Sequence, residues 1–136
     1  MRKIYLLLTP LLLAGCIEQS GSYYVSDTRD HAITVRAAQE YFWDDTVTLK
    51  VVVSHYPECQ RAMPFSKVNK ADVAVELFSN AEGVFTLRSG TDVIQVDTLN
   101  CTALATPAPD ALGDGVGVFS LGATDKLEFN LAAPAK

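Results

Sequence analysis

The chain has 136 residues and carries 16 acidic against 11 basic side chains, a formal net charge of −5 at pH 7. Its length suits one domain, and with 49% hydrophobic residues that domain can bury a core of its own. The acidic balance argues against nucleic acid as a partner, because binding to a phosphate backbone depends on lysine and arginine side chains that neutralise it.

The first sixteen residues have the three-part layout of a secretory signal. Arg2 and Lys3 give a positive start, an apolar run follows over Ile4–Ala14, and small residues lead to Cys16. The apolar run is too short for a lasting membrane span, which needs about 20 apolar residues. The sequence therefore predicts export from the cytoplasm.

The motif Leu13-Ala14-Gly15-Cys16 resembles the lipobox of bacterial lipoproteins. This resemblance implies that residues 1–15 are a cleaved signal peptide and that Cys16 is acylated, so that palmitate is incorporated and the protein is held in the membrane. Because Ile17 follows the cysteine where an aspartate would signal the inner membrane, the resemblance implies the outer membrane, with the domain facing the periplasm. The alternative is an ordinary secretory signal that ends in a cysteine by chance.

The remaining chain is expected to form a single all-β domain, an antiparallel sandwich or a small barrel of about seven to eight strands. Residues 16–22, the lipidated cysteine and a short polar segment, are expected to be a tether, and residues 23–136 the domain. Alternation of apolar and polar residues predicts the strands, with turn residues between them. The predicted strands are 23–25, 32–38, 46–54, 72–79, 84–88, 92–97, 116–121 and 127–131, of which 72–97 form a meander.

Two stretches are candidate binding surfaces. Three consecutive aromatics, Tyr41-Phe42-Trp43, cannot all face one core, so Phe42 and Trp43 are candidates for contact with a partner. The alternative is that Tyr41 and Trp43 belong to the core and Phe42 covers a second face. The aperiodic segment 55–70 is predicted to be a long loop, whose Arg61 and Phe65 are further candidates, the alternative being a solvated loop.

The two other cysteines, Cys59 and Cys101, make an even pair in an oxidising compartment and predict a disulfide. The alternative is that they stay reduced and act with His55, as metal ligands or as a cysteine–histidine nucleophile. Three soft ligands match no closed zinc spacing, and we expect no metal. His31 is expected to be exposed or to cap a strand.

No catalytic motif is found, so we expect a non-catalytic protein without a cofactor. The chain resembles small proteobacterial envelope lipoproteins in Leu13–Cys16, Tyr41–Trp43 and Pro57–Arg61, and this resemblance implies no known activity. The expected partners are the membrane, through the lipid on Cys16, and another envelope protein, with the chain as a binding or structural module. The alternatives are an inhibitor of a lysozyme-like hydrolase, and a metal carrier or enzyme that uses His55 and Cys59.

Overall fold

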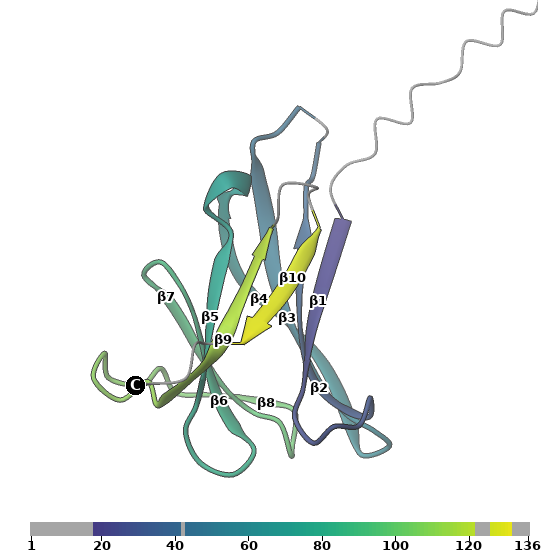
Figure 1. Ribbon diagram of the computed structural model, residues 1–136, viewed down its shortest axis with the longest axis vertical. Coiled ribbons are helices and arrows are strands. Elements are labelled where there is room, and N and C mark those ends of the chain that lie inside the picture. Colours follow the sequence, from purple (N-terminus) through teal and green to yellow (C-terminus); the bar gives the residue numbers. More distant parts are fainter. Residues whose placement is uncertain (1–17, 42, 122–125, 132–136) are drawn as a thin grey trace, which may run out of the picture.

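The computed structural model describes residues 18–41, 43–121 and 126–131, which form ten β-strands in two antiparallel sheets (Figure 1). Apart from one short 3-10 turn, η1, this described part contains no helix, and hence none long and apolar enough to cross a membrane. The elements are β1 (Glu18–Tyr24), β2 (His31–Ala38), β3 (Thr46–His55), β4 (Cys59–Asn69), η1 (Lys70–Asp72), β5 (Ala74–Ser79), β6 (Val84–Ser89), β7 (Asp92–Asp97), β8 (Thr102–Leu104), β9 (Asp114–Leu121) and β10 (Leu127–Leu131).

The all-β class is confirmed, and the number of strands is larger than expected. The first sheet has the order β1-β2-β3-β4, so every strand pairs with its neighbour in sequence. The second has the order β10-β9-β5-β6-β7-β8 and contains the expected meander as β5, β6 and β7. The two sheets are not closed into a barrel. They exceed the eight predicted strands because β4 and β8 were not recognised, and the strand expected at 23–25 is only the end of the longer β1.

The core lies between the two sheets and is built from the apolar sides of the alternating strands. Because side chains of a strand point to opposite faces in turn, each strand offers every second residue to the facing sheet. The fully buried apolar side chains are Ile33, Val35 and Ala37 of β2, Val47, Leu49, Val51 and Val53 of β3, Val75 and Leu77 of β5, Leu87 of β6, Val96 of β7 and Phe119 of β9. The predicted buried faces of 32–38 and 46–54 are therefore confirmed, whereas Leu131, which the sequence predicts to face inward with Leu127 and Phe129, is 74% exposed at the end of edge strand β10.

The expected tether is corrected, because Glu18–Ser22 belong to β1. Glu18 pairs with Ala38 of β2, while Cys16 and Ile17 lie outside the described residues. Residues 18–22 look polar because β1 is an edge strand. The one large side chain of β1 that packs against the core is Tyr23, whose ring lies 5.2 Å from that of Phe129. A side chain on Gly21 would come within 3.2 Å of the Leu127 carbonyl oxygen, so glycine lets β1 approach β10 closely.

The expected long loop 55–70 is also corrected, because it is a tight turn followed by β4. Its alternation is hidden by a β-bulge: Leu49 pairs with Ser66 but Lys50 pairs with Pro64, which leaves Phe65 as an extra residue. Proline is tolerated at a bulge of an edge strand, where no ladder hydrogen bond depends on its nitrogen. The two proline residues that suggested a loop therefore mark a turn and a bulge.

The confirmed core allows a direct test with one buried and one exposed leucine. Leu77→Ala is expected to lower the free energy of unfolding by about 2–5 kcal/mol, because it leaves a cavity between the sheets. Leu131→Ala, at a side chain 74% exposed, is expected to change it by less than about 0.5 kcal/mol. Urea unfolding of both variants measures the difference, and equal losses would contradict this description of the core.

Candidate functional site

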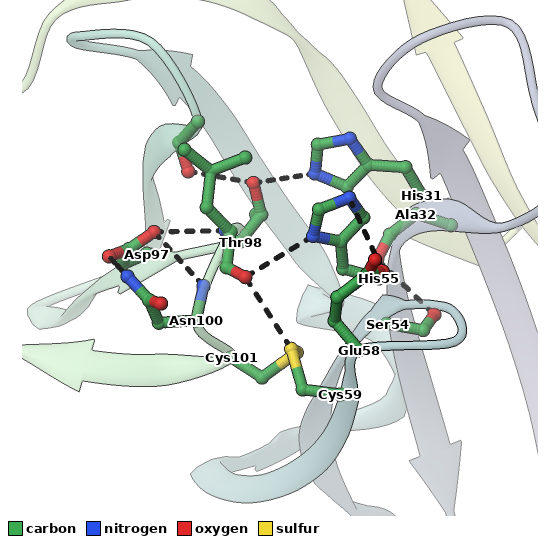
Figure 2. Close-up of a disulfide and its surroundings, with 12 residues drawn as sticks. His31, Ala32, Ser54, His55, Glu58, Cys59, Asp97, Thr98, Asn100 and Cys101 are labelled. Atoms are coloured by element: carbon green, nitrogen blue, oxygen red, sulfur yellow. Dashed lines mark hydrogen bonds and ion pairs between the residues drawn. A yellow bond between two sulfur atoms is a disulfide. The ribbon is translucent and has the colours of Figure 1, made fainter.

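The predicted disulfide is present and links the two sheets (Figure 2). Cys59 is the first residue of β4, and Cys101 lies in the turn between β7 and β8, with 6.0 Å between their α-carbons. Because the turn at Tyr56–Glu58 is tight, Cys59 is held at the end of the β3–β4 hairpin and not in a loop. The bond therefore ties one end of the first sheet to the second.

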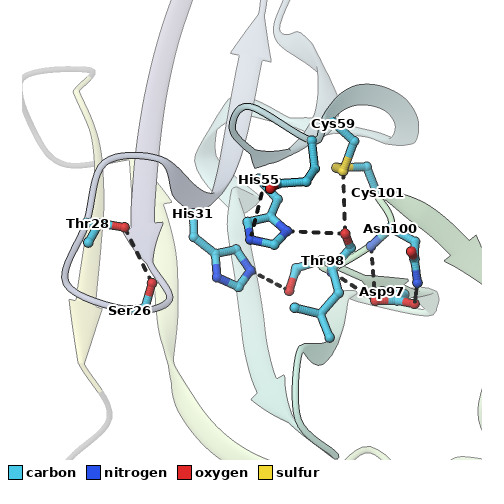
Figure 3. Close-up of polar contacts among 11 residues, drawn as sticks. Ser26, Thr28, His31, His55, Cys59, Asp97, Thr98, Asn100 and Cys101 are labelled. Carbon is cyan, nitrogen blue, oxygen red and sulfur yellow. Dashed lines mark hydrogen bonds and ion pairs between the residues drawn. A yellow bond between two sulfur atoms is a disulfide. The ribbon is translucent and has the colours of Figure 1, made fainter.

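Both histidines lie beside this disulfide (Figure 3). His31 begins β2 and His55 ends β3, they are direct partners in register, and their rings lie 4.5 Å apart at 30°. The Thr98 hydroxyl donates to the Gly83 carbonyl oxygen (2.7 Å), so it must accept the hydrogen bond from Nε2 of His31 (2.8 Å). His31 is thus buried and hydrogen-bonded, and the expectation of an exposed or capping histidine is wrong.

His55 is hydrogen-bonded to the same β7–β8 turn, but through Nδ1, whereas His31 uses Nε2. Its Nδ1 donates to the Leu99 carbonyl oxygen at 3.2 Å, and its Nε2 lies 4.0 Å from a carboxylate oxygen of Glu58. Sγ of Cys59 lies 3.7 Å from the same Leu99 oxygen, a packing contact because a disulfide sulfur has no proton to donate. The Leu99 carbonyl group is therefore enclosed by groups of the first sheet.

The turn itself is shaped by Asp97. Its carboxylate accepts hydrogen bonds from the amide of Leu99 (2.9 Å) and from the side chain of Asn100 (2.8 Å). The hydrogen bond from the Asn100 side chain has the largest effect and lowers the pKa of Asp97; burial opposes it, and the backbone hydrogen bonds from Leu99 and Asn100 lower the pKa further. A fixed carboxylate thus orients Thr98 and Leu99 toward the histidines.

These contacts hold the two sheets together at one end. We call this group of residues, the Cys59–Cys101 disulfide with His31, His55, Thr98 and Leu99, the joint. The sulfur of Cys59 is bonded to Cys101, so it is no thiolate beside His55, and that alternative is contradicted. Among the residues that the structure describes, no group of three or more His, Cys, Asp or Glu side chains could hold a metal ion. The polar groups of the joint are used to hold the two sheets together.

The aromatic candidates lie at the opposite end of β2 and β3, in the connection between them. Trp43 is 67% and Tyr41 47% exposed, and their rings stack at 4.9 Å and 11°. The alternative that both belong to the core is therefore wrong, and Phe42 lies outside the described residues. The connection is braced by the Gln39 side chain, which donates to the Asp44 carbonyl oxygen.

The other two candidates, Arg61 and Phe65, lie on strand β4 and not on a loop. Arg61 is exposed and pairs with Val53, whereas Phe65 is half-buried and packs against the core. Phe65 borders an open groove of about 530 Å³ that is crossed by the hydrogen bond from Ser66 to Asp92 of β7 (2.6 Å). The structure brings neither residue next to Trp43.

Sequence reasoning missed a group of cations on the outer face of the first sheet. Arg36 of β2 and Lys50 of β3 are direct cross-strand partners, and Lys67 of β4 is on the same face opposite Thr48. All three are exposed, and Arg36 and Lys50 line a shallow depression of about 330 Å³. Within the described ranges none of them has an ion pair. We call Arg36, Lys50 and Lys67 the basic face.

Comparisons with known proteins do not assign a function to these features. No protein-family model, no curated protein and no solved structure matches the chain. The function is therefore argued from the joint, the aromatic pair and the basic face.

Removal of the disulfide is expected to destabilise the joint and the fold. The bond closes a separation of 42 residues, which corresponds to about 4 kcal/mol in the chain-entropy model. The variant Cys59→Ala/Cys101→Ala should lose about this much free energy of unfolding in urea. As a control, a reducing agent should destabilise the unmodified protein and leave the double variant unchanged; no loss in the double variant would contradict the role given to the bond.

The buried histidine is expected to make stability depend on pH. Burial, and then the charge of His55 beside it, lower the pKa of His31. The unfolded chain therefore takes up this proton first, so the stabilisation is full above the ordinary histidine pKa of about 6.5 and is lost as pH falls through the lower folded pKa. His31→Gln, which keeps an N–H donor for Thr98, should lose less unfolding free energy between about pH 7.5 and pH 5. Parallel losses in the two proteins would show that His31 is not responsible.

Proposed function

We propose that the protein is a non-catalytic, lipid-anchored module of the outer membrane that faces the periplasm and binds another envelope protein through its basic face. The observation that carries the proposal is the placement of Arg36 directly opposite Lys50, both exposed and without an ion pair in the described chain. Like charges on directly opposed positions of a sheet repel each other and cost stability. An acidic partner removes that cost.

The charge distribution supports a protein partner. The chain as a whole is acidic, with a net charge of −5. Its basic face therefore attracts an acidic partner surface, while the acidic remainder of the protein repels it, and this favours one orientation of binding. Glu18 lies on the rim of the same depression without pairing with either cation, so the cations are available to carboxylates from outside. Hydroxyl groups of Ser20 and Thr48 beside them can add hydrogen bonds.

The remaining chemistry of the chain supports a binding role over catalysis. A candidate nucleophile or general base needs a free side chain in a pocket, next to a group that it can serve. The sulfur of Cys59 is oxidised, His31 is buried on Thr98, and His55 is bonded to Leu99. Each of these groups already has a structural partner.

The anchor is part of the proposal. Cys16, in the motif that resembles a lipobox, is two residues before Glu18, the first residue of β1. Two residues span at most about 7 Å, so acyl chains on Cys16 would hold the domain directly at the membrane surface. The partner is then expected to be within reach of that surface.

Charge reversal on the basic face tests the proposal. Arg36→Glu/Lys50→Glu should reduce the partner captured by crosslinking in intact envelopes by roughly tenfold, because two attractive ion pairs become repulsive. The matched control Arg29→Glu/Lys126→Glu makes the same change in net charge at exposed residues that lie outside the strands and do not line the depression, and it should keep the capture. Equal capture by the two variants would contradict binding through the basic face, and absence of palmitate from Cys16 would contradict the anchor.

A further inference from the structure

The strand register places the aromatic pair at the same end of the molecule as the beginning of β1. Glu18 pairs with Ala38, the last residue of β2, and the chain then enters the connection that carries Tyr41 and Trp43. In Figure 1 this connection forms the top of the domain and β1 begins in the upper part below it, whereas the β3–β4 turn lies at the bottom. Any lipid on Cys16 is therefore attached at the aromatic end.

From this placement we infer that the stacked side chains of Tyr41 and Trp43 insert into the headgroup region of the bilayer that holds the lipid on Cys16. The inference rests on the acylation of Cys16 proposed above and goes beyond it, because it assigns a second membrane contact and an orientation. The surface that the two aromatic side chains contact is thus that of a phospholipid bilayer.

The chemistry of the pair fits this surface. Tryptophan and tyrosine combine an apolar ring with one polar group, and both are enriched where a membrane meets water. Here the rings are exposed, 67% for Trp43 and 47% for Tyr41, and their stacking makes one continuous apolar area at the tip of the connection. Removing apolar ring surface from water is favourable, so both rings are stabilised when they move from water to the headgroup level.

The charges around the pair set its depth and the kind of lipid. Exposed Glu40 precedes the pair, and half-buried Asp44 and exposed Asp45 follow it; Lys70 lies beside Asp45, with its amide donating to the Asp45 carbonyl oxygen (2.8 Å). Carboxylates do not enter hydrocarbon, so the tip stops at the headgroups. Charges of both signs fit zwitterionic headgroups, which present a phosphate and an ammonium group.

This contact would fix the orientation of the domain relative to the membrane. With the anchor and the aromatic pair at the same end of β1, β2 and β3, the strands rise from the membrane. The ten residues of β3 extend about 33 Å away from it, to the disulfide joint. The basic face is on the side of this upright sheet and remains open to a partner.

The position of Trp43 permits a direct test, because it is the only tryptophan of the chain. The full-length acylated protein is reconstituted into zwitterionic phosphatidylethanolamine–phosphatidylcholine vesicles, with and without lipids brominated near the headgroup. We expect Trp43 emission to shift to shorter wavelength, to be quenched by the brominated lipids and to become protected from aqueous iodide. The matched control is Trp43→Phe/Tyr56→Trp, which moves the reporter to a side chain 46% exposed in the turn at the far end of β3. Its emission should be unaffected by brominated lipid.

The outcomes separate this inference from the proposed function. Palmitate labelling of Cys16 is measured on the same sample, so that missing label counts against the anchor, and therefore against both. Labelled protein whose Trp43 remains open to iodide in vesicles would overturn the membrane contact and leave the anchor intact. Protection of Trp43 only after an envelope extract is added would show that the pair binds a protein, and would equally overturn the inference.

Discussion

The structure depends on one joint, in which the turn between β7 and β8 is clamped against the ends of β2, β3 and β4. The clamp is covalent through Cys59–Cys101 and polar through Thr98 with His31 and Leu99 with His55. Two facing sheets that do not close into a barrel are otherwise held by the core and by contacts along their edges, such as β1 against β10 at Gly21. Because the joint combines a disulfide with buried hydrogen bonds, its loss removes both the constraint on the unfolded chain and the partners of buried polar groups.

The joint also lies away from the features on which the proposed function rests. All the histidine and disulfide chemistry is collected at one end of β2 and β3, whereas the exposed aromatic pair is at their other end. The rigid strands between these ends carry the basic face on their outer side. For the proposed binding through the basic face, this arrangement keeps the geometry of its side chains, because they lie on strands that the joint fixes at one end.

The form of β4 bears on how a partner is bound. An edge strand of eleven residues would be a template for strand addition, but Pro64 and the bulge at Phe65 interrupt its outer hydrogen-bonding row, and Lys67 adds a charge. Natural sheets use these same devices to prevent unwanted pairing at an edge. The β4 edge is thus protected against strand addition, which agrees with the proposed recognition through side chains on the face of the sheet.

The sequence by itself determined the all-β class, the buried side of the alternating strands and the disulfide, because period-two patterning and an even cysteine pair are local or compositional signals. It did not reveal β4, whose alternation is broken by one bulged residue. It predicted only the end of β1, because the polar start of this edge strand resembles a tether. It also left open whether Tyr41 and Trp43 are buried, and it could not bring Arg36 opposite Lys50 or His31 against His55. Those facts are decided by strand register and by which sheet covers which face, and both depend on contacts between residues far apart in the chain.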